Sequence, residues 1–218
     1  MLYSTVVATE LLVAEIIPTV LATDIQEYNR LVDVLSFAPI LHIDVMDGKF
    51  AKPKSINLVQ AHWPESSKVH IHLMVDNPAE HIETLVAKQP DVIILHAESS
   101  SFSESFTELQ SMDIAVHVAL LPETRPDDVP ELAIADGCLI FGGKLGSYGG
   151  EADLSQLDKV ETLRAMNPEL TLGWDGGANE HNIAKLVSRN IEFINVGSAV
   201  QKAKNPQSAY ATLVALAE

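Results

Sequence analysis

Two side chains that could do chemistry interrupt an otherwise apolar segment near residue 42. His42 and Asp44 alternate with Leu41, Ile43 and Val45. Side chains two residues apart in a β-strand point to the same side, so the imidazole and the carboxylate would be neighbours on one face. Turning both groups into a protein interior is unfavourable unless a proton, a polar partner or a metal ion satisfies them. The segment therefore predicts a functional site on a buried strand.

Two other segments carry side chains of the same two kinds. His70 and His72 alternate with apolar residues in the segment 69–74, and Asp175 follows an apolar segment further along the chain. Imidazole nitrogens and carboxylate oxygens are ligands of zinc and of other divalent transition metals. Two imidazoles and two carboxylates at three strand ends could therefore hold one divalent cation.

The rest of the chain alternates short apolar segments with amphipathic ones. Residues rich in Ile, Val and Leu predict strands at 16–21, 40–45, 69–74, 92–95, 115–119, 138–141, 171–174 and 193–196. Apolar residues at three-and-four spacing predict helices at 25–35, 79–87, 102–110, 129–133, 154–166, 182–187 and 209–216, and at most a short helix at 56–61. Strands that are apolar on both faces and alternate with helices form parallel sheets covered on both sides.

Eight such units predict an α/β fold, a single (β/α)8 TIM barrel with parallel strands. We expect one domain over residues 1–218, with an N-terminal extension at 1–15 and the barrel at 16–218. An open doubly wound sheet is the competing architecture, but it usually carries a glycine-rich turn after its first strand. The segment 18–24 contains no glycine, so the sequence favours the barrel.

In such a barrel the functional side chains lie at the C-terminal ends of the strands. This chain places Thr19, His42, Asp44, His72, His96 and Asp175 there. Two carboxylates on opposite walls beside a metal could remove a proton from one face of a carbon and return one to the other face. The metal would polarise a neighbouring carbonyl and stabilise the enediolate that proton removal forms. This arrangement predicts epimerisation, with His96 as a core histidine or a pocket wall rather than a ligand.

Glycine-rich turns after the last three strands could supply the other half of a substrate site. These turns are 146–150, 176–178 and 197–199. Backbone amides that glycine leaves accessible can bind a phosphate, and TIM barrels commonly bind phosphate near the loops after strands 7 and 8. The turns therefore predict a phosphorylated substrate.

The composition indicates which partners and which cellular compartment to expect. The chain has 14 Lys and Arg against 30 Asp and Glu, a formal net charge of −16, which argues against nucleic acids and anionic membranes as partners. The single cysteine, Cys138, lies in an apolar segment and allows no intramolecular disulfide. The segment 5–17 lacks a basic start and contains two glutamates, so we expect no export signal, no membrane span and a cytoplasmic protein.

The chain also resembles the ribulose-phosphate 3-epimerase family, from about Ile16 to its C-terminus. The motifs that carry the resemblance are Pro18-Thr19-Val20-Leu21, His42-Ile43-Asp44-Val45-Met46-Asp47-Gly48, His72-Leu73-Met74, Asp175-Gly176-Gly177 and Gly197-Ser198-Ala199, of which the second is highly specific. The resemblance implies an isomerase that interconverts D-ribulose 5-phosphate and D-xylulose 5-phosphate by two-base proton transfer at C3. It also implies a homo-oligomer, either a dimer or a hexamer.

Roles for individual residues follow from this resemblance. His42, Asp44, His72 and Asp175 would bind the divalent metal, with zinc first and iron, manganese or cobalt as alternatives, and Asp44 and Asp175 would be the paired acid and base. Substrate-binding positions are implied at Thr19, Met46, Met74, Gly149, Gly150, Gly176, Gly177, Gly197 and Ser198. The two methionines would line the substrate beside the metal, and the glycine turns would hold its phosphate.

Several residues depart from the family's pattern. Thr19 replaces a serine but keeps the hydroxyl, and the loop 146–151 lacks the family's proline and ends in Glu151 in place of glutamine. A methionine that usually precedes this loop is replaced near Gly142, and Trp174 precedes the acid of the seventh strand. Two alternatives stay open: an epimerase of another ketose phosphate, such as a 2-ketohexose 6-phosphate, and a non-catalytic phosphate-binding barrel. A metal-independent phosphosugar lyase is less favoured, because no predicted strand ends in a lysine.

Overall fold

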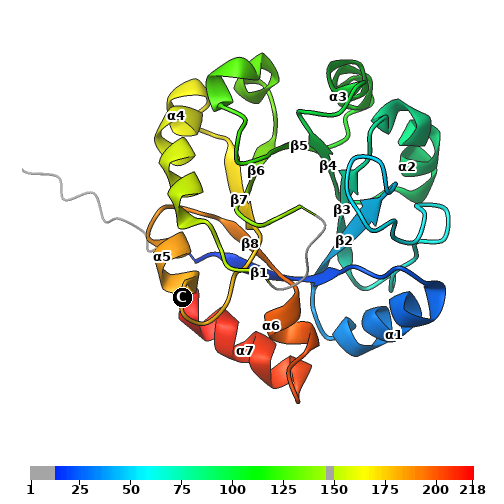
Figure 1. The fold of residues 1–218 in the computed structure, drawn as a ribbon, viewed down its shortest axis with the longest axis vertical. Coiled ribbons are helices and arrows are strands. Elements are labelled where there is room, and N and C mark those ends of the chain that lie inside the picture. The colour runs from blue at the N-terminus through cyan, green and yellow to red at the C-terminus, as the bar shows by residue number, and fades with distance from the viewer. Residues whose placement is uncertain (1–12, 146–149) are drawn as a thin grey trace, which may run out of the picture.

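Eight parallel strands close into a barrel in which each strand pairs with its neighbours in chain order (Figure 1). The computed structural model describes residues 13–145 and 150–218. The strands are β1 (Glu15–Val20), β2 (Ile40–Met46), β3 (Lys68–Met74), β4 (Val92–His96), β5 (Val116–Leu120), β6 (Gly137–Phe141), β7 (Thr171–Asp175) and β8 (Phe193–Val196). The predicted α/β fold, a (β/α)8 TIM barrel with parallel strands, is confirmed. The boundary between an N-terminal extension and the barrel stays a prediction, because residues 1–12 lie outside the described part.

Helices surround the strands on the outside of the barrel (Figure 1). They are α1 (Ile25–Leu35), α2 (Ile82–Lys88), α3 (Phe102–Ser111), α4 (Lys159–Met166), α5 (Ile183–Val187), α6 (Ser198–Gln201) and α7 (Pro206–Leu216), with 3-10 turns η1 (Pro78–His81), η2 (Pro126–Asp128), η3 (Pro130–Ala133) and η4 (Leu154–Asp158). The predicted helix at 129–133 is the 3-10 turn η3. Within the described ranges, no helix is long and apolar enough to cross a membrane.

Local sequence and packing together define α1. The side chain of Asp24 accepts hydrogen bonds from the backbone N–H groups of Gln26 and Glu27, at 3.0 and 2.9 Å, and so caps the N-terminus of the helix. The residues that α1 buries recur at helical spacing: Tyr28, Leu31, Val32 and Leu35. These side chains join the large apolar core between the strands and the helices.

A smaller apolar core fills the barrel itself. Its members all lie on the strands: Ile17, Ile40, Ile94, Ala119, Leu139 and Phe193. The ring of Phe193 fills the space in front of Gly173, where a Cβ would lie 1.9 Å from the ring. Several of these residues precede a polar residue by two positions, as Ile40 precedes His42. The polar side chains therefore form a layer at the C-terminal ends of the strands, directly above the packed apolar side chains inside the barrel.

The segment 47–67, which is described throughout, contains no helix, so the predicted short helix at 56–61 is wrong. Two side chains hold a single turn there instead. The N–H of Gln60 donates to Asn57 Oδ1 at 3.0 Å, and the N–H of Asn57 donates to Gln60 Oε1 at 3.2 Å. The N–H of Ile56 donates to the carbonyl of Ala22 at 2.9 Å. Because these partners satisfy the backbone, the segment does not extend into a helix.

His117 lies at the N-terminal end of the barrel interior, where burial keeps its imidazole neutral. The residue is 6% exposed, and its ring packs against Phe193 with the ring centroids 5.4 Å apart. Burial lowers the pKa of His117 from 6.5 to about 4, and the charge of Asp136 only partly opposes this shift. Unfolding exposes the imidazole to water, so the unfolded chain binds an additional proton between these two pH values.

We therefore expect His117 to destabilise the protein as the pH falls. A pKa that rises from about 4 to about 6.5 on unfolding removes about 2 kcal/mol of unfolding free energy between pH 7 and pH 5. Urea unfolding at the two pH values should show a smaller loss in His117→Leu than in the wild type. His181→Leu, at an exposed position, is the matched control and should keep the wild-type pH dependence. Equal losses in the wild type and His117→Leu would contradict this prediction.

Candidate functional site

Four ligand atoms from three strands meet at the C-terminal end of the barrel. His42 and Asp44 come from β2, His72 comes from β3, and Asp175 ends β7. The register of β2 and β3 places Asp44 directly beside His72. One ligand atom from each residue lies within 4.8 Å of all the others. The structure therefore brings together the four side chains for which metal binding is predicted.

The distances within this cluster fit one small divalent cation. Asp44 Oδ1 lies 3.1 Å from His42 Nε2 and 3.0 Å from His72 Nδ1. Asp175 Oδ2 lies 3.6 Å from each of the same two nitrogens, which are 3.2 Å apart. A tetrahedral ion with bonds of about 2.0–2.1 Å to nitrogen and oxygen separates its ligand atoms by about 3.3 Å. Both the donor types and their spacing suit an ion such as zinc.

Burial and mutual contacts shift the pKa values of the two carboxylates in opposite directions. Burial alone would raise the pKa of Asp44, but the hydrogen bonds and charges of His42 and His72 hold it well below its usual range. Burial raises the pKa of Asp175, and the negative charge of Asp44 raises it further. The pair thus combines a carboxylate that stays ionised with one that retains a proton more readily, a combination suited to acid–base chemistry.

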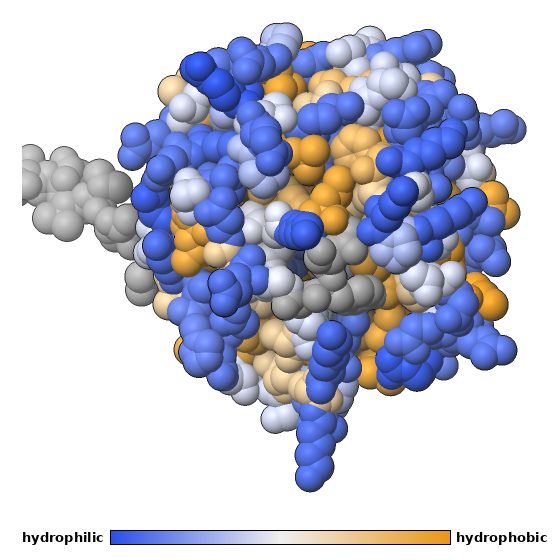
Figure 2. Space-filling view, viewed as in Figure 1, coloured by the Kyte–Doolittle hydropathy of each residue, from blue (hydrophilic) through white to orange (hydrophobic). Residues whose placement is uncertain are grey.

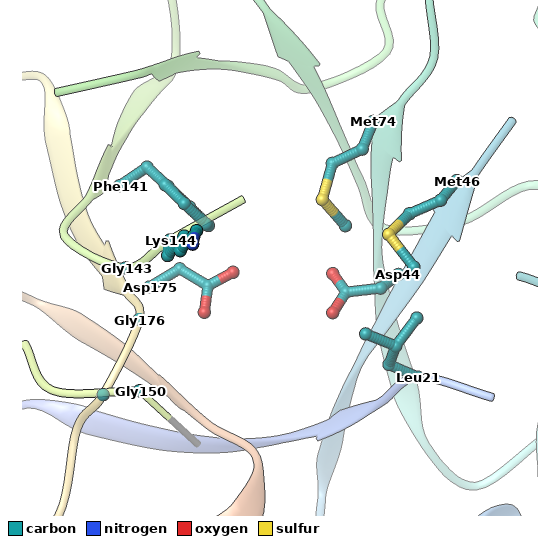
Figure 3. A pocket seen from close by; sticks show the side chains of 11 residues that line it. Leu21, Asp44, Met46, Met74, Phe141, Gly143, Lys144, Gly150, Asp175 and Gly176 are labelled. Atoms are coloured by element: carbon teal, nitrogen blue, oxygen red, sulfur yellow. The ribbon is translucent and has the colours of Figure 1, made fainter. Parts of the chain in front are cut away.

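Asp44 and Asp175 face each other across a cavity (Figure 3). Met46 and Met74 lie beside Asp44, and Phe141 lies on the side of Asp175. In the view down the barrel, apolar side chains gather near the centre of the face and hydrophilic side chains form its rim (Figure 2). The apolar walls limit the access of water to the carboxylates, which strengthens electrostatic interactions between them and a ligand.

A second cavity of similar size adjoins the first, and both carboxylates also line it. Thr19, Asn195, Gly197 and Ser198 contribute to its wall. Thr19 Oγ1 and Asn195 Oδ1 are buried and have no hydrogen-bond partner among the described residues. Because a buried polar atom without a partner is unfavourable, these two atoms are suited to bind hydroxyl groups of a ligand.

The glycine turn after β7 packs directly against the loop after β6. Gly176 and Gly177 have φ angles of +110° and +68°, in the region that favours glycine. A Cβ on Gly176 would lie 2.2 Å from the amide nitrogen of Gly143, so no side chain fits there. Gly176 and Gly177 line both cavities, and Gly150 lines the first. Gly149 lies outside the described residues.

Residues without a predicted role also belong to the site, among them Phe141, Lys144 and Asn195. Phe141 ends β6 and lines the first cavity, one residue before Gly142, where the family's methionine was expected to be replaced. Lys144 lines the same cavity on the side of Asp175 (Figure 3). Asn195 Nδ2 lies 3.4 Å from His42 Nε2. Asn195 could have been found from the sequence, because it is a polar residue within the apolar segment of the last strand.

His96 is not one of the four clustered side chains, but it lies directly behind His72. His96 Nε2 is 2.9 Å from His72 Nε2, and His96 Nδ1 is 3.3 Å from Glu98 Oε2. Burial lowers the pKa of His96 to about 4, although the hydrogen bond to Glu98 opposes this shift. The predicted core histidine therefore has polar partners on both ring nitrogens.

Gly142 and Trp174, both expected to depart from the family's pattern, pack against each other. A Cβ on Gly142 would lie 2.0 Å from the indole ring of Trp174, so a larger residue at 142 would displace that ring. The indole N–H of Trp174 donates to the carbonyl of Gly176 at 2.8 Å and so supports the turn after β7. Glu151 is exposed and is not among the described residues that line the two cavities.

Comparison with solved structures supports the fold. The 3-hexulose-6-phosphate synthase of Salmonella typhimurium superposes with a TM-score of 0.66 at 11% sequence identity, over 93% of this chain and 98% of that chain. KGPDC from Streptococcus mutans superposes with a TM-score of 0.68 at 11% identity, over 94% of this chain and 97% of that chain. At such low identity, these similarities show the fold alone.

Comparison of the sequence with families and curated relatives is more specific. The family model described as "Ribulose-phosphate 3 epimerase family" matches residues 15–201, a range that includes all four clustered ligands. The ribulose-phosphate 3-epimerase of Helicobacter pylori is 26% identical over 200 residues, which are 88% of this chain and 92% of the relative. That of Synechocystis is 28% identical over 208 residues, 89% of this chain and 90% of the relative. Matched over most of its length, this chain belongs to the ribulose-phosphate 3-epimerase family.

Proposed function

We propose that this chain interconverts D-ribulose 5-phosphate and D-xylulose 5-phosphate by moving a proton at C3 between two carboxylates. The names of the curated relatives, ribulose-phosphate 3-epimerase, support this reaction. One structural observation carries the proposal. Asp44 and Asp175 face each other across a cavity, and one ring nitrogen from each of His42 and His72 lies within 3.6 Å of both carboxylates.

The two carboxylates act from opposite sides of the reacting carbon. A ketose in the first cavity would place C3 between Asp44 and Asp175, so that one carboxylate removes the C3 proton. The other carboxyl group then delivers a proton to the opposite face and inverts the configuration. In the reverse direction the two groups exchange roles. A single base that returned the proton to the same face would only regenerate the starting sugar.

A divalent cation would be held by His42, Asp44, His72 and Asp175, with zinc as the first choice and iron, manganese or cobalt as alternatives. When bound, it stabilises the negative charge that develops on the C2 oxygen as the C3 proton leaves. His42 and His72 are fully buried, so their rings have little freedom to leave the ligand positions. Rigid ligands suit this reaction, because the positive charge of the cation must already be in position when the C3 proton leaves.

The second cavity would bind the rest of the substrate. Thr19 Oγ1 would donate a hydrogen bond to a sugar hydroxyl or accept one from it, and Asn195 Oδ1 would accept one, because neither atom has a partner among the described residues. The phosphate would be held by backbone amides of the glycine turns, through Gly149, Gly150, Gly176, Gly177, Gly197 and Ser198. Met46 and Met74 would cover the sugar on the side of the metal.

Lys144 adds a positive charge to this otherwise acidic site. The chain carries a net charge of −16, which repels a phosphorylated sugar, whereas Lys144 lines the first cavity. We expect Lys144→Gln to raise KM for D-ribulose 5-phosphate by about tenfold, a loss of about 1.4 kcal/mol of binding, with little change in kcat. Steady-state kinetics measures both constants.

The matched control for this prediction is Lys68→Gln, which removes the same charge at the exposed start of β3, the opposite end of the barrel. Its KM should stay at the wild-type value. Added salt should raise KM more in the wild type than in Lys144→Gln, because salt screens the attraction that the variant has lost. An unchanged KM in Lys144→Gln would mean that this ammonium group does not contact the substrate.

A second candidate function is that of an epimerase of another ketose phosphate, such as a 2-ketohexose 6-phosphate, because the loop 146–151 after β6 departs from the family's pattern. Phe141 and Lys144, which precede this loop, line the first cavity. To distinguish the two candidate activities, kcat/KM of the metal-loaded protein is measured on a panel of ketose phosphates. We expect kcat/KM to be at least about tenfold higher for D-ribulose 5-phosphate. Metal binding without turnover of any ketose phosphate would instead identify a non-catalytic barrel.

We also propose that the chain works in the cytoplasm as a homo-oligomer, a dimer or a hexamer, with neither nucleic acid nor membrane as a partner. The net charge of −16 disfavours anionic partners, and Cys138 is a buried free thiol, as is common in a reducing compartment. Size-exclusion chromatography with light scattering measures the oligomeric state directly, and a mass of one chain would contradict the expectation.

A further inference from the structure

A chain of hydrogen bonds leads from His72 away from the cavity into the protein. His72 Nε2 lies 2.9 Å from His96 Nε2, and His96 Nδ1 lies 3.3 Å from Glu98 Oε2. His72 and His96 are both fully buried, so these rings have no alternative partner in water. The other oxygen of the same carboxylate, Glu98 Oε1, accepts from the backbone N–H of Leu121 at 2.9 Å and from the hydroxyl of Thr124.

The chemistry of these groups allows only one direction for the hydrogen bonds. An ionised carboxylate can only accept, so His96 must carry its proton on Nδ1 and donate it to Glu98. A neutral imidazole with a proton on Nδ1 has an acceptor at Nε2. His72 must therefore donate from Nε2, which leaves its Nδ1 with a lone pair. That lone pair points into the cluster, where Nδ1 lies 3.0 Å from Asp44 Oδ1.

From this chain of bonds we infer that Glu98 and His96 are positioning residues, which fix the tautomer of His72 so that its Nδ1 can bind a divalent cation. The inference rests on the metal site of the proposed function and adds two residues to it. Partners behind a ligating histidine commonly orient its ring and raise its affinity for metal. Here the orienting carboxylate acts through a second imidazole and is itself held by the loop after β5.

The variant Glu98→Gln tests the inference. It should reverse the direction of the hydrogen bonds between residue 98, His96 and His72 while changing the shape of the side chain very little. The side-chain carbonyl of glutamine must stay with the N–H of Leu121 and the hydroxyl of Thr124. Its NH2 group then faces His96 Nδ1 and donates to it. His96 would carry its proton on Nε2, and His72 would carry its proton on Nδ1, the atom that must face the metal. We expect the affinity for Zn²⁺ to fall by about 10- to 100-fold.

Matched variants separate this effect from general damage. Thr124→Val removes one donor to Glu98 but keeps the carboxylate, so the affinity for Zn²⁺ should stay within a few-fold of the wild type. His96→Gln can still donate to Glu98 and accept from His72, so it should largely preserve the affinity, whereas His96→Leu should lose it as Glu98→Gln does. Thermal unfolding of the metal-free proteins provides the check that each variant folds.

Two measurements decide the outcome. Competition with a chromophoric chelator gives the affinity for Zn²⁺, and long-range ¹H–¹⁵N correlation spectra of the zinc-loaded wild type show which nitrogen of His96 carries the proton. We expect that proton on Nδ1. A proton on His96 Nε2, or an affinity of Glu98→Gln equal to that of the wild type, would overturn the inference. If the wild type itself bound no Zn²⁺, the metal site of the proposed function would be wrong instead.

Discussion

Replacing Asp175 with asparagine should lower turnover in both directions by at least about a thousandfold, which corresponds to about 4 kcal/mol of barrier. Asparagine keeps the shape of the side chain and one oxygen in the cluster, but it cannot carry the proton that the reaction moves. Because Asp44 remains, the variant should exchange the C3 proton of at most one of the two epimers with solvent. A coupled assay measures turnover, and NMR measures deuterium uptake at C3 of each epimer separately.

Two controls make this result specific. Asp44→Asn should show the complementary pattern, in which exchange is confined to the other epimer. Asp33→Asn changes an exposed carboxylate on α1 and should keep wild-type activity. Metal content is measured for every variant, because both site carboxylates also belong to the ligand cluster. Wild-type exchange with both epimers in Asp175→Asn would rule out the proton-transfer role of Asp175.

Removing the divalent metal should have an effect of similar size. We expect a chelator to lower kcat/KM by at least about a thousandfold, because the charge that forms on the substrate oxygen then has no cation beside it. Zinc, manganese or cobalt added back should restore activity. The metal-free protein should also unfold at a lower temperature, since an ion that binds only the folded state stabilises it.

A pair of histidine variants separates loss of the metal from side effects of the chelator. His42→Ala removes one buried ligand, and added metal should not restore its activity. His62→Ala changes a histidine outside the cluster and should recover like the wild type. Full activity in protein whose metal content lies below detection would contradict the role of the cation.

The meeting of His42, Asp44, His72 and Asp175 could be predicted because their positions depend on short-range rules. In a strand, the two-residue spacing of His42 and Asp44 fixes their common direction, and the C-terminal ends of barrel strands converge. The register of β2 and β3, which pairs Asp44 with His72, depends on contacts between strands that the sequence does not reveal. This register determines how close the side chains of Asp44 and His72 lie to each other.

The remaining site residues depend on packing between distant segments. Phe141 and Lys144 flank the turn at Gly142, and that turn is shaped by the indole of Trp174 on the next strand. No local pattern shows which way such a loop turns. The hydrogen-bonded pair of His72 and His96 joins β3 to β4 through a contact of the same non-local kind. The wrong prediction of a helix at 56–61 has a local cause. Apolar residues there recur at near-helical spacing, but the side chains of Asn57 and Gln60 bind the backbone and hold it in a turn.

The most direct test of the two-carboxylate site is a single reaction in D₂O. Metal-loaded wild-type protein is incubated with D-ribulose 5-phosphate, and ¹H NMR follows the sugar. We predict that D-xylulose 5-phosphate appears with deuterium at C3, because the carboxyl group that delivers the proton exchanges with solvent. Absence of D-xylulose 5-phosphate, or product that keeps its original hydrogen at C3, would contradict proton transfer between Asp44 and Asp175.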